Sequence, residues 1–146
     1  MKSFYGCLDA GFVKYVPQPL QHLALANKAS KLGGELLFYT AEDFETLVSQ
    51  GTIKAKMAEQ PAVDGFIFFT IRQFFYGEKL NLNLMNSMLD QKYEIHFARE
   101  DLSIPTAESL EMAYPMIYST CHVLKRDSSD EFWRPIWNSM GQGSSL

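Results

Sequence analysis

Four short apolar runs, alternating with stretches of helical spacing, constrain the fold of this chain more than any other feature. The runs are residues 3–8, 35–40, 66–70 and 93–98. Their apolar character is continuous rather than alternating, which is typical of strands that are buried on both faces of a sheet. Apolar side chains recur at helical spacing between them, in residues 20–32, 46–59 and 83–91. The alternation predicts an open four-stranded parallel sheet with helices on both faces.

A long helix is predicted after the last strand, over residues 105–125. Pro105 suits the first turn, because a proline there gives up no helical hydrogen bond, and Glu108 complements the helix dipole. Pro115 removes a backbone donor and is expected to kink the helix. Apolar side chains spread over more than one stripe of this helix, more than one small domain buries. We therefore expect a homodimer or higher homo-oligomer that forms through it.

The length of 146 residues suits one domain with one core. Ser128 and Glu131 match a capping box at the start of a second, shorter helix that carries Trp133 and Trp137. The last residues, "GQGSSL", are small and polar. The predicted units are an α/β domain over 1–127, a helical tail over 128–140 and a disordered tail over 141–146.

Charge and composition exclude several classes of function. The net charge is −4 and the pI is about 5.3, so the chain has no broad basic surface for nucleic acid. Cys7 and Cys121 stand far apart and do not combine with the histidines into zinc-site spacing. The sequence contains no phosphate-loop, dinucleotide-loop or hydrolase-elbow motif, no signal peptide and no membrane-length apolar run. We expect a cytoplasmic protein without a metal, a cofactor, a nucleic-acid partner or a membrane partner.

Polar side chains follow each predicted strand. In open parallel sheets, ligands bind beyond the carboxyl ends of the strands. The residues at those ends are Asp9, Lys14, Tyr15 and Gln18, then Thr40, Glu42 and Asp43, then Thr70, Arg72 and Gln73, and finally Arg99, Glu100 and Asp101.

These residues suggest an anion site, because a guanidinium group binds phosphate or carboxylate through a fork of N–H donors. A carboxylate there would serve as an acid or base once burial raises its pKa. Two alternatives remain open: Arg72 and Glu100 form a structural ion pair, and His96 is a structural histidine with its hydrogen bonds satisfied. The proposed catalytic residues are Glu100, Asp9, Glu42 and His96. The proposed substrate-binding residues are Arg72, Arg99, Gln73, Thr70, Lys14, Gln18 and Tyr15.

Residues 3–125, which include "IHFAREDLSIPTAESLEMAY" at 95–114, resemble the catalytic domain of serine recombinases, the resolvases. In that family a strand ends in glutamate, followed by threonine and a long dimerising helix; Glu100 and Thr106 match this pattern, and Arg72 falls near the family's arginine region. The resemblance implies a three-layer resolvase-like or flavodoxin-like fold. The family's nucleophilic serine follows strand one, where this chain has "LDAGFVKYVPQPLQ", and Ser3 stands at the wrong end of that strand. We therefore expect no recombinase activity.

A second resemblance, along nearly the whole chain, is to the sporadic carbohydrate cluster family. The stretches that carry it are "VPQPLQHLALANKASKLGGELLF", "VDGFIFFTIRQF" and "KYEIHFAREDLSI". The family is encoded among bacterial surface-polysaccharide and sugar-nucleotide genes, so the resemblance implies a setting in glycan assembly. It transfers no catalytic residue.

Two functions follow from these expectations. The first is a small protein that binds or transforms an anionic sugar or sugar nucleotide at the strand ends. The second is a non-catalytic oligomeric module that docks to an enzyme of a carbohydrate pathway, through the long helix and the aromatic tail.

Overall fold

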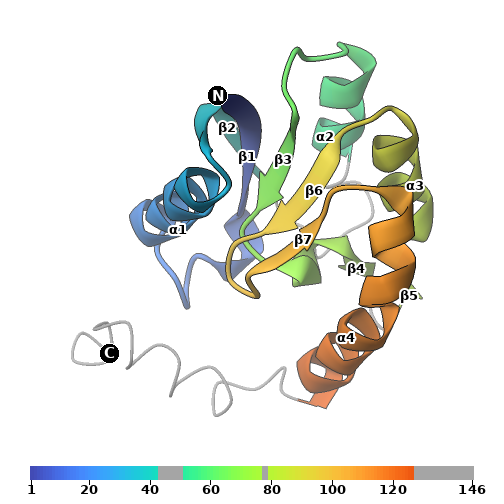
Figure 1. The fold of residues 1–146 in the computed structure, drawn as a ribbon. Coiled ribbons are helices and arrows are strands. Elements are labelled where there is room, and N and C mark those ends of the chain that lie inside the picture. The colour runs from blue at the N-terminus through green and yellow to red at the C-terminus, as the bar shows by residue number, and fades with distance from the viewer. Residues whose placement is uncertain (43–50, 77–78, 127–146) are drawn as a thin grey trace.

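The computed structural model describes residues 1–42, 51–76 and 79–126. Its centre is a five-stranded sheet in the order β2-β1-β3-β6-β7 (Figure 1). The first four strands of that order run parallel to one another, as the apolar runs predict. The strands are β1 (Lys2–Asp9), β2 (Gly34–Glu42), β3 (Gly65–Phe68), β6 (Glu94–Phe97) and β7 (Leu102–Ile104).

The prediction of a purely parallel, four-stranded sheet is wrong, because β7 is a fifth strand that runs antiparallel to β6. The turn between them explains the reversal. Asp101 adopts a left-handed backbone conformation, with φ of 51°, and its N–H donates to the Ala98 carbonyl at 3.2 Å. A turn this short can join only antiparallel neighbours, since a parallel connection needs a long crossover. The sheet is therefore mixed.

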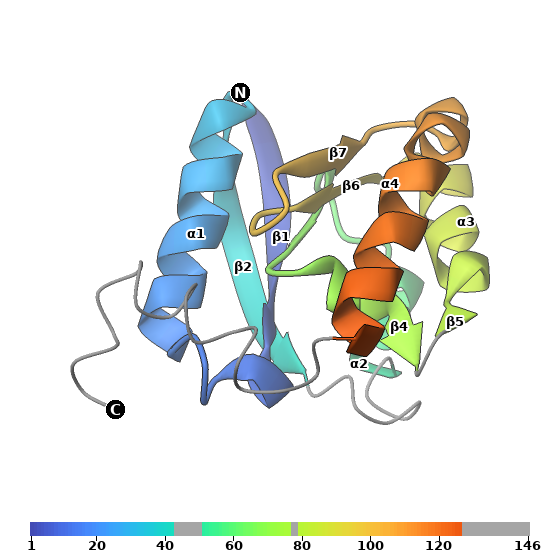
Figure 2. The ribbon, with the colours of Figure 1, turned by 90° about the horizontal axis from the view of Figure 1, so that it is seen from below.

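Helices cover both faces of the sheet, as expected. Figure 2 shows α1 on one side of the strands, with α3 and α4 on the other. Residues 46–50 of the predicted second helix lie outside the described residues. The helices are α1 (Gln18–Lys31), α2 (Gly51–Ala58), α3 (Leu82–Asp90) and α4 (Ala107–Arg126).

The start of α4 differs from the prediction, because Pro105 precedes the helix rather than occupying its first turn. The chain before it is taken up by β7, and the cap comes from Thr106, whose Oγ1 accepts a hydrogen bond from the Ser109 N–H at 3.2 Å. The helix then continues through Pro115. No helix among the described residues is long and apolar enough to cross a membrane. The two tails predicted over 128–140 and 141–146 lie outside the described residues.

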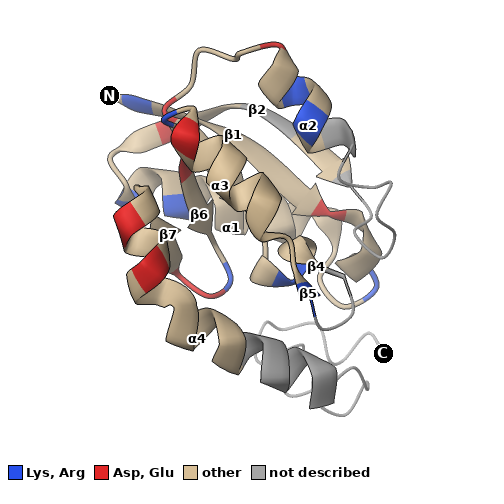
Figure 3. Ribbon diagram, turned by 90° about the vertical axis from the view of Figure 1, so that its right-hand side faces the viewer, with Lys and Arg blue, Asp and Glu red and all other residues tan. Residues whose placement is uncertain are grey.

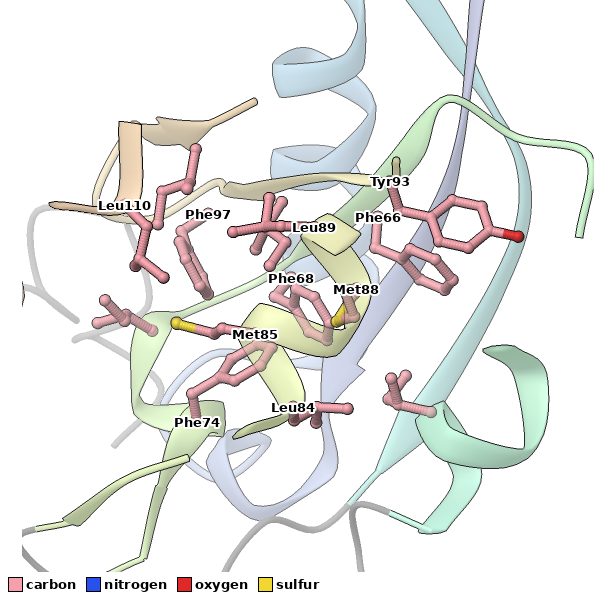
Figure 4. Packing of buried hydrophobic residues seen from close by; sticks show 14 of the residues in the cluster. Phe66, Phe68, Phe74, Leu84, Met85, Met88, Leu89, Tyr93, Phe97 and Leu110 are labelled. Carbon is pink, nitrogen blue, oxygen red and sulfur yellow. The ribbon is translucent and has the colours of Figure 1, made fainter. Parts of the chain in front are cut away.

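A hydrophobic core lies on each face of the sheet, because alternate residues of a strand point to opposite faces. Ile67 and Phe69 of the β3 region pack beneath α1, together with Phe4 and Leu25. The larger core lies on the other face. Figure 4 shows this cluster, which includes Phe66, Phe68, Phe97 and the α3 residues Leu84, Met85, Met88 and Leu89.

Short elements after β1 and β3 shape the edge where the parallel strands end. A 3-10 turn, η1 (Ala10–Phe12), follows β1 directly, and its cap is the side chain of Asp9. A second turn, η3 (Ile71–Phe74), follows β3 and is capped by Thr70 in a capping box with Gln73. A small antiparallel hairpin of β4 (Phe75–Tyr76) and β5 (Lys79–Leu80) then leads into α3.

Candidate functional site

The ends of β1 and β3 are joined by an ion pair between Asp9 and Arg72. Arg72 Nε donates to Asp9 Oδ2 at 2.7 Å, and its Nη2 lies 3.4 Å from Oδ1. The Asp9 side chain is fully buried, whereas that of Arg72 is 23% exposed. Asp9 Oδ1 also accepts from the Gly11 N–H at 3.1 Å, so the carboxylate holds both its own turn and the arginine. This pairing differs from the Arg72–Glu100 ion pair that the sequence left open.

Two buried glutamines hold the backbone around this pair. Gln21 of α1 accepts from the Asp9 N–H at 2.8 Å, and its Nε2 donates to the carbonyls of Asp9 and Val16 at 3.0 Å each. Gln73 of η3 accepts from the Thr70 N–H at 2.9 Å and donates to the carbonyl of Cys7 at 3.3 Å. Both amides bond to backbone groups of the segments around β1 and β3, so they fix the geometry of the strand ends.

Glu100 accepts hydrogen bonds from three groups near the ends of β3 and β6. Its Oε2 accepts from the Thr70 hydroxyl at 2.7 Å and from Arg99 Nη1 at 3.1 Å, and its Oε1 accepts from the Ile71 N–H at 2.9 Å. Glu100 thereby connects the end of β6 to the start of η3. Burial lowers the pKa of Arg99 below its usual value, while the adjacent Glu100 carboxylate opposes that change.

Phe12 lies beneath both arginines. The guanidinium carbon of Arg72 is 5.1 Å from the centre of the Phe12 ring, and that of Arg99 is 5.9 Å from it. These distances are within the range of cation–π attraction, which orients a guanidinium plane. Phe12 itself is buried in the core beneath α1. Two positive groups from different strand ends therefore share one aromatic base.

The charges of this cluster balance, with one carboxylate for each guanidinium. Arg72 Nε and Nη2 face Asp9, and among the described residues none accepts a hydrogen bond from Arg72 Nη1. That nitrogen carries two N–H donors on a side chain that is partly exposed. The arrangement is suited to holding an additional anion at Arg72, whereas the buried Asp9 carboxylate is already committed to the arginine.

The structure brings together most of the predicted residues, namely Asp9, Thr70, Arg72, Gln73, Arg99 and Glu100. We call these six residues and Phe12 the arginine cluster. Three further predicted binding residues follow β1, namely Lys14, Tyr15 and Gln18. Lys14 is exposed, and its Nζ lies 4.9 Å from the centre of the Tyr15 ring. Gln18 is exposed at the start of α1. Their roles in binding stay predictions.

Glu42 and His96 are the two remaining predicted catalytic residues. The backbone of Glu42 is paired with that of Asp9 in the sheet, but its side chain lies outside the described part of the structure. His96 lies within β6, where its ring nitrogens contact Glu94 and Ser103 rather than the arginines.

Sequence reasoning missed two contributors to the cluster. Phe12 was not singled out, because an aromatic residue three positions after a strand is no local signal for a ring beneath a cationic site. Gln21 was missed because its role depends on tertiary contact. A glutamine in the first turns of a helix is ordinary, and nothing in the local pattern shows that its amide faces the end of β1.

No protein-family model matches the sequence, and no curated protein sequence matches it either. Among solved structures, the crystal structure of a resolvase family site-specific recombinase from Streptococcus pneumoniae is similar over 100% of both chains, with a TM-score of 0.58 and 8% sequence identity. At that identity the likeness shows the fold alone. The chain has a resolvase-like α/β fold, which confirms that part of the sequence expectation. The comparisons give no support to the carbohydrate-cluster resemblance.

Proposed function

We propose that this protein binds the anionic part of a small molecule at the arginine cluster, and that the ligand is a phosphorylated sugar or a sugar nucleotide. The observation that carries the proposal is the pair of guanidinium groups over Phe12, with Arg72 Nη1 left without an acceptor among the described residues. A fork of N–H donors on a partly exposed arginine matches the oxygens of a phosphate group. The sugar part of the proposal rests on the carbohydrate-cluster resemblance alone.

Binding is favoured over acid–base catalysis by the state of the two carboxylates. Asp9 is fully buried and paired with Arg72, so its oxygens do not reach a ligand at the surface. Glu100 accepts three hydrogen bonds, from Thr70, Ile71 and Arg99. A general base needs an oxygen within hydrogen-bond reach of the substrate proton. Both carboxylates instead position the arginines.

Strand exchange is not proposed, in spite of the fold. The residues after β1 are Ala10, Gly11 and Phe12, so no serine stands where resolvases carry their nucleophile. A shared fold does not transfer chemistry when the reacting group is missing.

Calorimetric titration with glucose 1-phosphate, UDP-glucose and uncharged glucose tests the proposal. We expect binding of the two anionic ligands only, and Arg72→Ala to weaken it about tenfold or more, as the loss of a charge-assisted contact does. Arg72→Lys keeps the charge but loses the fork of N–H donors. Its affinity for the anionic ligands should therefore lie between those of wild type and Arg72→Ala. Lys54→Ala removes an exposed cation from α2 and is the matched control. Equal affinity of wild type and Arg72→Ala, with both folded, would exclude the arginine cluster as the site.

A second proposed function is self-association through α4. Met112, Met116 and Tyr118 are large apolar side chains that are 85%, 51% and 50% exposed. Figure 3 shows acidic residues on the first turns of α4, and residues 112–119, which follow them, carry no charge. Met112 and Met116 lie one turn apart and so share an exposed apolar strip, and burial of such a strip against a second copy of the same helix is favoured.

Sedimentation velocity tests this second proposal. Wild type should sediment as a dimer at micromolar concentration, and Met112→Glu combined with Met116→Glu should sediment as a monomer. Leu23→Glu introduces the same charge at an exposed leucine of α1, on the other face of the sheet, and should leave the dimer intact. A monomeric wild type would contradict the proposal. Docking of the aromatic tail to another enzyme stays a prediction, because Trp133 and Trp137 lie outside the described residues.

A further inference from the structure

A second group of chemically reactive side chains lies on β6 and β7, away from the arginine cluster. His96 of β6 is paired in register with Ser103 of β7, and Glu94 stands two residues before His96 on the same face of the strand. The Ser103 hydroxyl is 2.8 Å from His96 Nδ1. His96 Nε2 is 2.8 Å from Glu94 Oε1. A hydroxyl, an imidazole and a carboxylate are thus connected in a line.

The chemistry of the two ends fixes the direction of the hydrogen bonds. An ionised carboxylate can only accept hydrogen bonds. Nε2 therefore carries the proton of the neutral imidazole and donates a hydrogen bond to Glu94. The opposite nitrogen of neutral imidazole then has a free lone pair. Nδ1 therefore accepts the proton of the Ser103 hydroxyl, which is the orientation that a base needs in order to activate a serine.

The surroundings hold the imidazole in place and keep it neutral. The edge of one ring faces the other in the Phe4–His96 pair, with centroids 5.4 Å apart and an angle of 88° between the planes. Lys2 of β1 contacts the other oxygen of Glu94 at 2.7 Å and so anchors the carboxylate. Burial lowers the pKa of His96 below 6.5; Glu94 opposes this, while Lys28 of α1 and Lys2 reinforce it. The base form therefore predominates at neutral pH.

Access to the serine completes the arrangement. His96 is buried, but Ser103 is only half-buried and lies on the edge strand of the sheet. Lys28, the α1 cation that acts on His96, is held by Asp101 at 2.7 Å in the turn just before Ser103. Ser103 is thus more accessible to solvent than the histidine that contacts it.

We propose that Ser103 is a nucleophile toward small carboxylic esters, with His96 as its general base and Glu94 as a positioning residue; we call the three the Ser103 relay. Ser103 Oγ attacks the ester carbonyl carbon while its proton passes to His96 Nδ1. The bond from carbonyl carbon to alkoxide oxygen then breaks, and the alcohol leaves with that proton. Water, deprotonated by His96, hydrolyses the acyl-serine, which releases the carboxylic acid and restores Ser103. The proposal is independent of anion binding at the arginine cluster.

A fluorophosphonate probe measures the nucleophilicity directly, because attack by Ser103 Oγ forms an O–P bond and expels fluoride. Peptide mapping by mass spectrometry should place the adduct on Ser103. Ser109 is the internal control, since among the described residues the one side chain within hydrogen-bond distance of its hydroxyl is Thr106, at 2.9 Å, and that group is no base. We expect Ser103 to react about 100-fold faster than Ser109, the lower range for general-base assistance. Equal labelling of the two serines would overturn the proposal.

Variants and pH separate the relay from a merely structural hydrogen bond. His96→Gln should reduce labelling of Ser103 to the rate of Ser109, with folding checked by circular dichroism. In wild type the labelling rate should rise with pH to a plateau, with its midpoint below pH 6.5. Glu94→Gln removes the group that raises the His96 pKa, so the midpoint should move to lower pH. A rate that rises steadily with hydroxide up to pH 9, with no plateau, would also overturn the proposal, and it needs no variant to fold.

Hydrolysis of p-nitrophenyl acetate provides the turnover assay. Wild type should show a burst of p-nitrophenol equal to the protein concentration, followed by slower turnover, and Ser103→Ala should lose both. Ser87→Ala is the matched control and should retain both, because Ser87 lies on α3 with its hydroxyl bonded to Gln91. Equal turnover in Ser103→Ala and wild type would show that other side chains cleave the ester, against the proposal.

Discussion

Arg72 and Asp9, which are 63 positions apart in the chain, meet at 2.7 Å where β1 and β3 end. The contact joins a fully buried carboxylate to a guanidinium that still reaches solvent. One partner of the pair therefore serves the fold, and the other remains able to contact a ligand.

Replacing Asp9 with asparagine should separate these two roles. Asn keeps an oxygen for the Gly11 N–H but removes the charge that faces Arg72. We expect the free energy of unfolding to fall by about 1–3 kcal/mol, since a hydrogen bond to a charged group is lost. Affinity for glucose 1-phosphate should rise, because the positive charge of Arg72 is no longer neutralised. Urea denaturation and calorimetry measure the two effects; a fall in affinity would show that Asp9 orients Arg72 more than it neutralises it.

Removal of the Gln21 amide should destabilise the protein strongly, because this glutamine of α1 is fully buried. Gln21→Ala leaves the Asp9 N–H and the Val16 carbonyl without their partner in a buried environment. Each unsatisfied group costs about 1–3 kcal/mol. Gln18→Ala, in the exposed first turn of the same helix, should change stability by less than about 0.5 kcal/mol. Similar midpoints of urea denaturation for the two variants would contradict this account.

We expect the Thr70 hydroxyl, at the end of β3, to contribute measurably to the free energy of unfolding. Thr70→Val retains the shape but removes the donor to Glu100 and the cap of η3. We expect a loss of about 1–2 kcal/mol, which combines an unpaired acceptor with a lost cap. Thr70→Ser keeps the hydroxyl and should lose much less. The melting temperatures of the two variants give the comparison, and equal values would show that the hydroxyl contributes nothing.

Stability should fall on acidification because of His96. Its pKa is lower in the folded protein than the usual value of 6.5, so the unfolded chain takes up a proton first as the pH drops. The free energy of unfolding should therefore decrease as the pH falls through 6.5 and level off below the folded pKa, with a slope of at most about 1.4 kcal/mol per pH unit. Urea denaturation at pH 7.5 and 5.5 measures the difference.

Two histidine variants assign that pH dependence. His96→Gln should abolish most of the difference between pH 7.5 and 5.5. His22→Gln, which replaces an exposed histidine on α1, is the matched comparison. The same loss of pH dependence in both variants would argue against His96 as its source.

The sequence predicts the parallel strands well because each buried strand is a continuous apolar run, as in "FIFFT". It does not predict β7. Three residues, "LSI", carry too little periodicity to be assigned, and the strand depends on the left-handed turn at Asp101. Pairing with β6 rather than local pattern makes these residues a strand.

The arginine cluster was predictable as a set but not in its pairings. Strand order brings Asp9, Arg72, Arg99 and Glu100 to one edge, and the rule for parallel sheets is enough to expect that. Which carboxylate meets which guanidinium depends on the turns η1 and η3, whose conformations follow from side-chain caps. The Ser103 relay was not predictable, because it requires the antiparallel register of β6 and β7.

The short β7 also decides the direction in which α4 travels. Because β7 runs back alongside β6, α4 can run toward η3. Ile117 of α4 then shares a hydrophobic core with Ile71 and Phe74, in the segment that carries Arg72. A second copy bound along α4 would therefore be connected, through this core, to the segment that carries Arg72, whose guanidinium we propose binds an anion. By thermodynamic reciprocity, the factor by which dimerisation changes anion affinity must equal the factor by which the anion changes dimerisation.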